Sequence, residues 1–516
     1  MDPLKAERHL QFVSDCTGGS AFEVMGLLFL VCSVGYLRFL FERSFIRNAS
    51  KTMQVFFYTS QLLLTLDLLA TVVAIVLPCT LLSNYVLETN IILLSIIFLF
   101  RLKTPSISLI NPITVFPHTL STWRRLARAF VLVYTCICIY AVDLPIFPRR
   151  FAKTEMVGVS LMDTGVGLIA VIIGFSNVAF LDACRHRPLP CFPLLKIVVR
   201  SVFPCFAVGI LRTVVVKALG YPEHVTEYGV HWNFFFTLAC IRLGGFIVAY
   251  ALSWLSDFNA MNAHFGLCIL LACFQQWGVL SYAQNHHFLR LSSLATTEGG
   301  SDRSAEGIAA LVRVNAEGLV SLPGYLCLFI YGTAIALLLR LHLDPPISQP
   351  ADKLKVLSFQ GKETWRGDPK KVAMAVLFIG VLAFLVVAVY GESSVSRRLV
   401  NLPYIALQIG LLSPLMAFFI YCIFDISEAK RAKATRKDVI PLITVLSDNA
   451  MLYFILSNLI TGLLNLLFDT LTLAEWQPAW FATMCQFLLL TTYTVTCPLL
   501  TLALSSLFCT ARTQCG

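Results

Sequence analysis

Long apolar stretches alternate with short polar segments along nearly the whole chain of 516 residues. A stretch of roughly 20 mostly apolar residues is long enough to cross a bilayer as an α-helix. The pattern predicts thirteen such helices, and the connections between them are too short to form an independent domain. Residues 1–516 are therefore expected to form one all-α, polytopic integral membrane domain. The expected ranges are 21–42, 56–77, 84–100, 129–143, 159–181, 195–217, 230–251, 264–284, 319–340, 372–390, 401–424, 441–467 and 480–508.

The composition excludes the soluble and disordered classes. Apolar residues make up 57% of the chain, the mean hydropathy is +0.77, and charged residues are only 13%, against ~25% in ordinary soluble domains. A water-soluble fold could not shield that much apolar surface, and disordered chains are polar and poor in aromatic residues. The 17 cysteines lie mostly within apolar stretches and form no CxxC pair, so we expect neither a disulfide framework nor a metal site.

The net charge of +10 bears on orientation, because Lys and Arg are enriched in cytosolic loops of membrane proteins. If the N-terminus lies in the lumen, the predicted cytosolic segments hold more than twice as many Lys and Arg as the lumenal ones. Glu428–Lys437 is the clearest cytosolic anchor. We therefore expect a lumenal N-terminus, a cytosolic C-terminus, contact with membrane lipid, and no nucleic-acid partner.

The lumenal segment Ala141–Glu155 breaks this charge rule, because it carries Arg149, Arg150 and Lys153. Its two prolines should end the preceding helix near Asp143. A helix C-terminus and apolar neighbours disfavour the Asp143 carboxylate, while the three cations favour it. An acid under such opposed influences is a reasonable general base. The alternative is a cluster of interfacial charges that only holds the loop in place.

A second lumenal segment opens the seventh predicted helix and contains His231, Trp232 and Asn233. His231 is a candidate base or hydroxyl ligand, although a hydrogen-bonded structural histidine is equally consistent with its position. Trp232 is also typical of the aromatic belt at a membrane interface.

A third lumenal segment, Ser393–Tyr404, contains the adjacent Arg397 and Arg398. The guanidinium group matches the geometry of phosphate oxygens, which favours phosphate recognition. Snorkelling of both side chains to lipid headgroups is the alternative.

Charged residues also occur within the predicted spans, where they are unfavourable unless they are paired or face water. They indicate a polar interior, which is either a transport pathway or a binding pocket. These residues are Asp67, Asp163, Arg212, Arg242 and Asp448.

Several strings together resemble one family, the GPI-anchored wall transfer proteins, also called phosphatidylinositol-glycan biosynthesis class W. They follow in the family's order and run through nearly the whole chain, except for a divergent stretch around 295–318. The strings are FVSDCTGGSAFEV (Phe12–Val24), VDLPIFPRRFAKTE with SLMDTGVG (Val142–Gly167), EYGVHWNFFFTL (Glu227–Leu238), SRRLVNLPY (Ser396–Tyr404) and SDNAMLYFILSNLITGLLNL (Ser447–Leu466).

The resemblance implies an enzyme of the endoplasmic reticulum membrane with thirteen spans. Such enzymes move a fatty acyl group, typically palmitoyl, from acyl-CoA to the inositol of glucosaminyl-phosphatidylinositol, an early step of GPI-anchor assembly. The family's catalytic acid and lysine fall on Asp143 and Lys153, and no cofactor other than the co-substrate acyl-CoA is implied. The candidate substrate-binding residues are Arg149, Arg150, His231, Trp232, Asn233, Arg397 and Arg398.

The chemistry of acyl transfer agrees with Asp143 and Lys153 as the catalytic pair. An inositol hydroxyl needs a base as it attacks a thioester, and a fixed cation stabilises the resulting oxyanion. We expect Asp143 to be the base and Lys153 the oxyanion stabiliser, while the reverse assignment stays open. The alternative function is a lipid transporter or flippase, whose site should lie near the midplane between repeats.

Overall fold

The computed structural model describes residues 8, 11–12, 14, 16–41, 62–103, 119–186, 191–218, 232–281, 315–343, 369–430 and 441–514. Within these residues every regular element is a helix, apart from one isolated bridge between Gly19 and Val159. In chain order the elements are α2 (Ala21–Phe41), α4 (Leu62–Thr71), η2 (Val72–Val76), α5 (Leu77–Cys79), η3 (Ser83–Tyr85), α6 (Val86–Lys103), α7 (Thr119–Ala141), η5 (Arg149–Phe151), α8 (Leu161–His186), α9 (Cys191–Ala218), α10 (Phe234–Ala251), α11 (Asp257–Cys273), η6 (Phe274–Leu280), α15 (Ala316–Val320), α16 (Leu322–Leu343), α17 (Pro369–Tyr390), η8 (Glu392–Ser394), α18 (Leu402–Lys430), α19 (Pro441–Asp448), α20 (Ala450–Leu467), η9 (Thr472–Glu475) and α21 (Ala479–Gln514).

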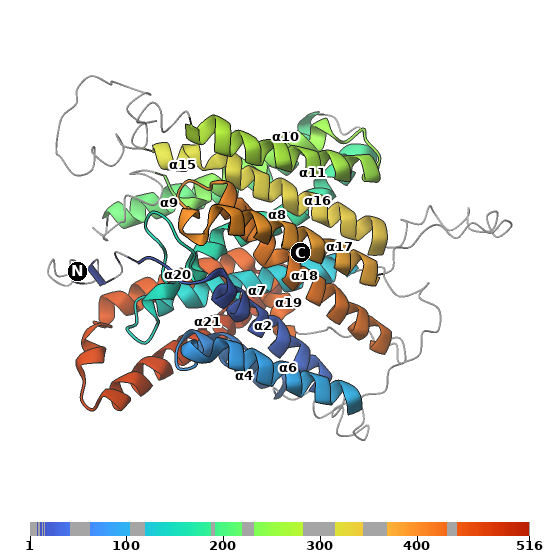
Figure 1. Ribbon diagram of the computed structural model, residues 1–516. Helices are drawn as coiled ribbons and strands as arrows, with labels where there is room; N and C mark the ends of the chain where they lie inside the picture. The colour runs from blue at the N-terminus through green and yellow to red at the C-terminus, as the bar shows by residue number, and fades with distance from the viewer. Residues whose placement is uncertain are drawn as a thin grey trace, which may run out of the picture.

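The long helices run side by side in one bundle, from left to right in Figure 1. Twelve helices of the described part are long and apolar enough to cross a membrane. The prediction of an all-α, multi-pass membrane protein is therefore confirmed. The twelve correspond to twelve of the thirteen predicted spans, and only 129–143 has no counterpart among them.

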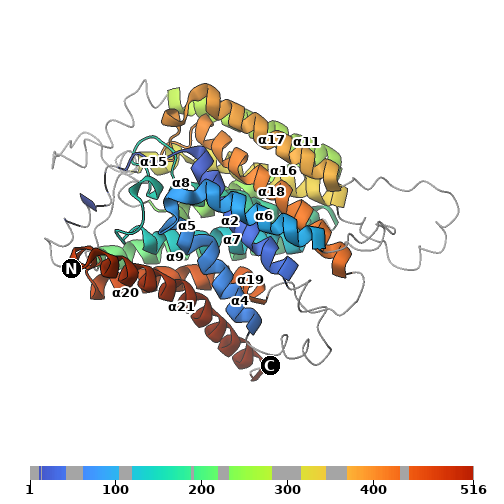
Figure 2. The same cartoon turned by 60° about the horizontal axis from the view of Figure 1, so that its bottom comes forward.

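The helix at the remaining position is α7, whose first half is too polar to count as an apolar span. Its 23 residues rise ~35 Å at ~1.5 Å per residue, enough to cross the ~30 Å hydrocarbon core. Helices α8, α19, α20 and α21 all pack against it, and it lies inside the bundle in Figure 2. Tyr134, Cys136 and Tyr140 on its second half are buried. The second half of the helix is therefore shielded from lipid by its neighbours, whereas Arg125 on the polar first half is about half exposed and pairs with Asp448.

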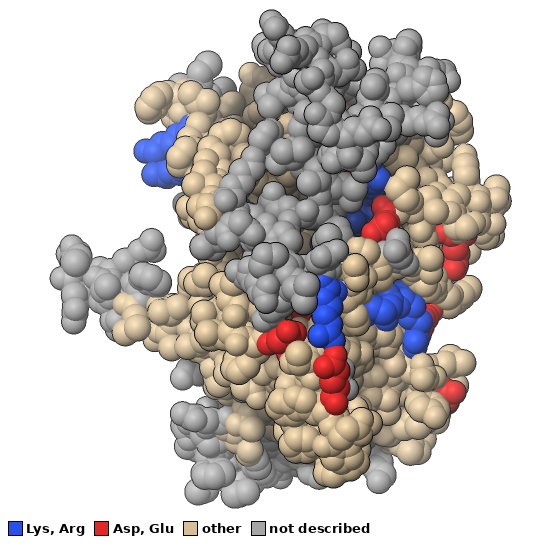
Figure 3. All heavy atoms as spheres, turned by 90° about the vertical axis from the view of Figure 1, so that its left-hand side faces the viewer, with Lys and Arg blue, Asp and Glu red and all other residues tan. Residues whose placement is uncertain are grey.

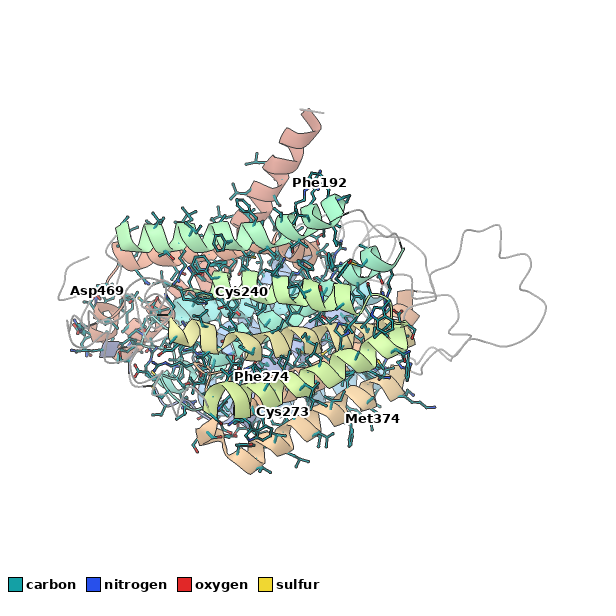
Figure 4. The ribbon with its side chains drawn as sticks, turned by 90° about the horizontal axis from the view of Figure 1, so that it is seen from above. Phe192, Cys240, Cys273, Phe274, Met374 and Asp469 are labelled. Carbon is teal, nitrogen blue, oxygen red and sulfur yellow. The ribbon has the colours of Figure 1, made fainter. Side chains whose placement is uncertain are left out.

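The outer helices present apolar side chains to the surroundings, as lipid contact requires. Figure 4 labels Phe192 on α9, Phe274 on η6 and Met374 on α17, which all lie on the periphery. Each of these side chains is more than half exposed. In a soluble protein such residues would be buried, so their exposure agrees with a lipid-facing surface.

The predicted span 441–467 is not one continuous helix. It consists of α19 and α20, which are separated at Asn449, where φ is −109° and ψ is 33°. The Asp448 carboxylate beside the break forms an ion pair with Arg125 of α7 at 3.3 Å. The apolar pattern alone could not show the break, because both halves carry the same pattern.

Helices α8 and α16 cross at a close backbone contact made by a glycine on each side. A Cβ atom built on Gly174 would lie 2.0 Å from the Phe329 carbonyl oxygen, and one on Gly332 would lie 2.0 Å from the Val171 carbonyl oxygen. The Thr333 hydroxyl donates to the Gly174 carbonyl across the same contact (3.0 Å). Small residues that let helix backbones approach are typical of packing in membranes.

We expect Gly332→Ala to lower the thermal stability clearly, because the added methyl group overlaps a backbone oxygen and forces the two helices apart. Overpacking of this kind typically costs ~1–3 kcal/mol. The measurement is the Tm of the purified protein in detergent. Gly462→Ala on α20 is the matched control, because nothing lies within 4 Å of its Cβ position. Equal Tm values for the two variants would contradict the close crossing.

Candidate functional site

The segment between α7 and α8, residues 142–160, lies at the left-hand end of the bundle in Figure 1 and is called the α7–α8 loop below. Leu144, Phe147 and Phe151 anchor it, since all three are fully buried. The Ile146 amide donates to the Gln486 side chain of α21 (2.7 Å). The loop is therefore held against the bundle by side chains from several helices.

Asp143 lies just beyond the end of α7, as the two prolines predicted. Its backbone N–H donates to the Tyr140 carbonyl in the last turn (3.2 Å). The side chain is buried, and its Oδ2 accepts a hydrogen bond from Asn465 Nδ2 at 2.7 Å. This hydrogen bond fixes the orientation of the buried Asp143 side chain against α20.

Three buried polar atoms around Asp143 have no hydrogen-bond partner within the part of the chain that the structure describes: Tyr140 Oη, Arg149 Nη1 and Asn465 Oδ1. Tyr140 precedes Asp143 by one helical turn, and Arg149 contacts the carbonyl next to it. Buried polar atoms are almost always hydrogen-bonded in folded proteins. Two donors and one acceptor therefore face the space around Asp143, where they suit a ligand that carries hydroxyl and phosphate oxygens.

Arg149 closes the C-terminal end of α7. Its Nη2 donates to the carbonyls of Val142 (2.8 Å) and Phe147 (3.0 Å), and its guanidinium stacks on the Phe12 ring at 4.1 Å. Burial lowers the pKa of Arg149 from its usual value, while the Cys16 thiol and the Asp143 carboxylate act in the opposite direction. Arg149 therefore has a structural role, and one of its nitrogens is left for a ligand.

Arg150 links the loop to the neighbouring helices α2 and η3. Its Nε contacts Glu23 Oε1 at 2.9 Å, and its Nη2 donates to Asn84 Oδ1 at 2.9 Å. These contacts occupy two of the three guanidinium nitrogens of Arg150. Its role in phosphate binding stays a prediction.

Lys153 follows η5 in the same loop and is half-buried between two fixed neighbours. Ala152 is fully buried, and the Thr154 hydroxyl donates to Asp163 Oδ2 at 2.7 Å. Asp163 belongs to the first turn of α8, where its N–H donates to the Ser160 hydroxyl (3.2 Å) as in an N-cap. Lys153 thus lies in a well-anchored segment at the same end as Asp143, and their action as a pair stays a prediction.

Arg397 and Arg398 are both bound to carboxylates of the protein. Arg397 Nε contacts Asp163 Oδ1 at 2.8 Å, and both side chains are almost completely buried. Arg398 pairs with Glu317 of α15, which is also buried. Figure 3 shows this end of the molecule, where basic and acidic side chains lie next to one another on its described part. The described contacts of Arg397 and Arg398 are structural. Phosphate binding by these two arginines stays a prediction.

Asn233 and Trp232 organise the start of α10, and His231 lies outside the described residues. Asn233 Oδ1 accepts from the Phe235 amide (3.0 Å), which makes it the N-cap, and its Nδ2 donates to the Gly209 carbonyl of α9 (2.9 Å). Trp232 Nε1 donates to the Thr237 hydroxyl (2.9 Å). These contacts support the structural alternative for both residues, while their substrate role stays a prediction.

Sequence reasoning missed Asn465 and Tyr140 as site residues. A signal for Asn465 was present, because α20 carries a polar residue at every fourth position and all of them are buried on one face. The series is Tyr453, Ser457, Thr461 and Asn465. A polar stripe within an otherwise apolar helix indicates a polar partner in the bundle interior.

This architecture defines a class: a multi-pass, all-α membrane protein that holds a buried carboxylate among amide, phenol and guanidinium groups at one end of the bundle. The chain matches the GWT1 family over residues 5–504 and belongs to that family.

Curated relatives agree with this assignment, and each is named GPI-anchored wall transfer protein 1. The relative from Cryptococcus neoformans var. grubii is 30% identical over 72% of this chain, and the match covers 60% of that protein. The relative from Gibberella zeae is 30% identical over 89% of this chain and 91% of its own length. The relative from Aspergillus fumigatus is 29% identical over 91% of this chain and 93% of its own length.

We expect Arg397→Leu to destabilise the protein by ~3–5 kcal/mol, because it leaves the buried Asp163 carboxylate without its counter-charge. The double variant Arg397→Leu/Asp163→Asn should lose clearly less stability. The asparagine at position 163 carries no charge, and its side-chain oxygen can still accept the hydrogen bond from Thr154. The measurement is the Tm of the two variants and the wild type. A double variant less stable than the single one would contradict a structural ion pair.

Proposed function

We propose that this protein transfers a fatty acyl group from acyl-CoA to an inositol hydroxyl of glucosaminyl-phosphatidylinositol, in the assembly of GPI anchors in the endoplasmic reticulum membrane. The observation that carries the proposal is Asp143, a buried carboxylate that accepts from Asn465 and has three polar atoms nearby that lack a partner among the described residues. The printed name of the relatives supports the GPI lipid as the substrate class.

The reaction needs a proton acceptor beside the attacking hydroxyl. In the proposed mechanism, Asp143 takes the proton of the inositol hydroxyl as its oxygen forms a bond to the thioester carbonyl carbon. The Lys153 ammonium stabilises the oxyanion of the tetrahedral intermediate. The carbon–sulfur bond then breaks, the thiolate of CoA leaves and takes up a proton, and the ester of inositol remains.

The groups around Asp143 would position a polyol. The Asn465 side-chain amide donates to one oxygen of the Asp143 carboxylate. The side-chain carbonyl oxygen of Asn465 is then left to accept from a substrate hydroxyl. The Tyr140 hydroxyl and Arg149 Nη1 can donate to hydroxyl or phosphate oxygens. Pre-arranged groups of this kind accelerate reactions because they do not have to reorient as charge develops.

We expect Asp143→Asn and Lys153→Ala each to abolish most acyl transfer. Loss of a general base typically lowers the rate ~10²–10⁴-fold, and loss of an oxyanion donor ~10²–10³-fold. Since the two groups act as a unit, the double variant should be little worse than the poorer single one. The measurement is the initial rate of labelled palmitoyl transfer from palmitoyl-CoA to glucosaminyl-phosphatidylinositol by purified protein.

The matched control is Asp469→Asn, which removes another carboxylate at the same end of the bundle, labelled in Figure 4. It should keep the wild-type rate. Near-wild-type transfer by Asp143→Asn at equal Tm would exclude Asp143 as the base. Movement of the GPI lipid between leaflets without any acylated product would favour the transporter alternative.

We expect Asn465→Leu to lower kcat by roughly 10- to 100-fold, because it removes a hydrogen bond of ~1.5–3 kcal/mol to the catalytic carboxylate. The control is Asn458→Leu on the same helix, whose amide donates only to its own helix at the Phe454 carbonyl (2.7 Å). The same labelled assay measures both variants. If both variants lose the same fraction of kcat, the loss comes from a less stable α20 and not from the missing hydrogen bond to Asp143.

A further inference from the structure

Four arginines gather on the first half of α7 and in the middle of α10, away from the end of α7 that leads to Asp143. Arg124, Arg125 and Arg128 follow one another on the first half of α7, and Arg242 of α10 lies within electrostatic range of Arg128. Asp448 is the one carboxylate that attracts Arg128 among the described residues, and it pairs with Arg125. Among the described residues the cluster therefore keeps a surplus of positive charge. Arg125 and Asp448 are about half exposed, whereas Arg128 and Arg242 are partly buried.

Several other arginines of this protein are neutralised by carboxylates. Arg38 binds Asp67 at 2.7 Å, and Arg340 binds Asp182 at 2.6 Å. Arg397 is matched in the same way by Asp163. Intramembrane charges without such a partner are unfavourable and usually mark a binding site or a pathway.

Within the described part of the chain, the hydrogen bonds of Arg128 and Arg242 all go to neutral groups. Arg128 donates to the Ser447 carbonyl (3.4 Å) and the Ser176 hydroxyl (3.1 Å). Arg242 donates through Nη1 to the Ser201 hydroxyl (2.6 Å), while its buried Nε has no partner within the described ranges. Arg242 occupies the middle of the 18-residue helix α10, so this cation lies far from either membrane surface.

The break between α19 and α20 adds to the positive potential. Helix α20 begins at Ala450 beside the contacts of Arg125 and Arg128, and Asn449 makes no side-chain cap. The first N–H groups of a helix favour anions. Discontinuous helices present such ends to anionic substrates inside membrane proteins. The guanidinium groups and this helix end therefore converge on the same region.

We propose that the arginines of α7 and α10, together with the amino end of α20, bind the phosphate groups of a phosphate ester roughly 20 Å along α7 from Asp143. Among the described residues Arg242 Nε is a buried donor without a partner, Arg124 adds a further guanidinium, and the fork geometry of guanidinium suits phosphate oxygens. The phosphates come either from CoA or from the headgroup of an anionic phospholipid.

The anion site is independent of the proposed function, whereas its assignment to the acyl donor rests on that function. The chain rises roughly 20 Å from Arg128 to Asp143 at ~1.5 Å per residue. A donor whose phosphates bind at the arginines would have to extend its arm along α7 to bring the thioester to Asp143. The polar stripe of α20 lies beside α7 along this path.

The test is the affinity of CoA for the full-length protein in nanodiscs of neutral phosphatidylcholine, measured by calorimetry. We expect Arg242→Gln to weaken binding roughly 10- to 100-fold, as loss of a charge-assisted hydrogen bond would. Arg124→Gln, which removes no described contact, should weaken it roughly 2- to 5-fold. Added salt should weaken wild-type binding further.

Arg212→Gln is the matched control, because it removes an exposed arginine of α9 outside the cluster. It should bind as the wild type does, and so should Asp143→Asn. A second set of nanodiscs contains phosphatidylinositol, whose retention by each variant is measured by native mass spectrometry. Arginine-dependent retention of this lipid without CoA binding would assign the site to a headgroup.

Equal binding of both ligands to the wild type, Arg124→Gln and Arg242→Gln would overturn the proposal. Failure of the proposed function would look different. In that case arginine-dependent binding would persist, but the wild type would form no labelled acyl product.

Discussion

The hydrogen bonds of the Arg149 guanidinium to the carbonyls of Val142 and Phe147 are the interaction on which the candidate site depends. A helix that ends at the edge of a membrane leaves carbonyl groups that water cannot fully satisfy. Arg149 binds the carbonyl of Val142, directly after α7, and that of Phe147 further along the loop, so it holds the chain in the turn that follows the helix. Asp143 is thereby held beside α20, and Lys153 is returned to the same end of the bundle.

The distribution of charge separates structural residues from candidates for function. Arg38, Arg340 and Arg397 have carboxylate partners, so they contribute to the fold and leave no charge to attract a ligand. Buried polar atoms without a partner occur at many places among the described residues, and some of them lie around Asp143 and on Arg242. Since buried polar groups are unfavourable when they are unsatisfied, a ligand bound at either place would stabilise the protein.

The apolar pattern predicted most helices, but it did not predict the partner of any polar side chain. Asn233 and Arg397 were expected to bind substrate, and the structure shows them capping α10 and neutralising Asp163. Which role a polar residue takes depends on which helix lies against it, and that is a property of packing between distant segments. The break at Asn449 was missed for the same reason, because the pattern continues through it.

The sequence by itself determined the class of protein and the location of the loop. The length of its apolar stretches sets the helices, and two prolines end α7 close to Asp143 because proline cannot continue a helix. Only the tertiary structure decided that Asn465 meets Asp143 and that Arg128 lies within electrostatic range of Arg242 and Asp448. The physical reason is that hydrogen bonds and ion pairs act over a few ångströms, between residues hundreds of positions apart that become neighbours only in the folded bundle.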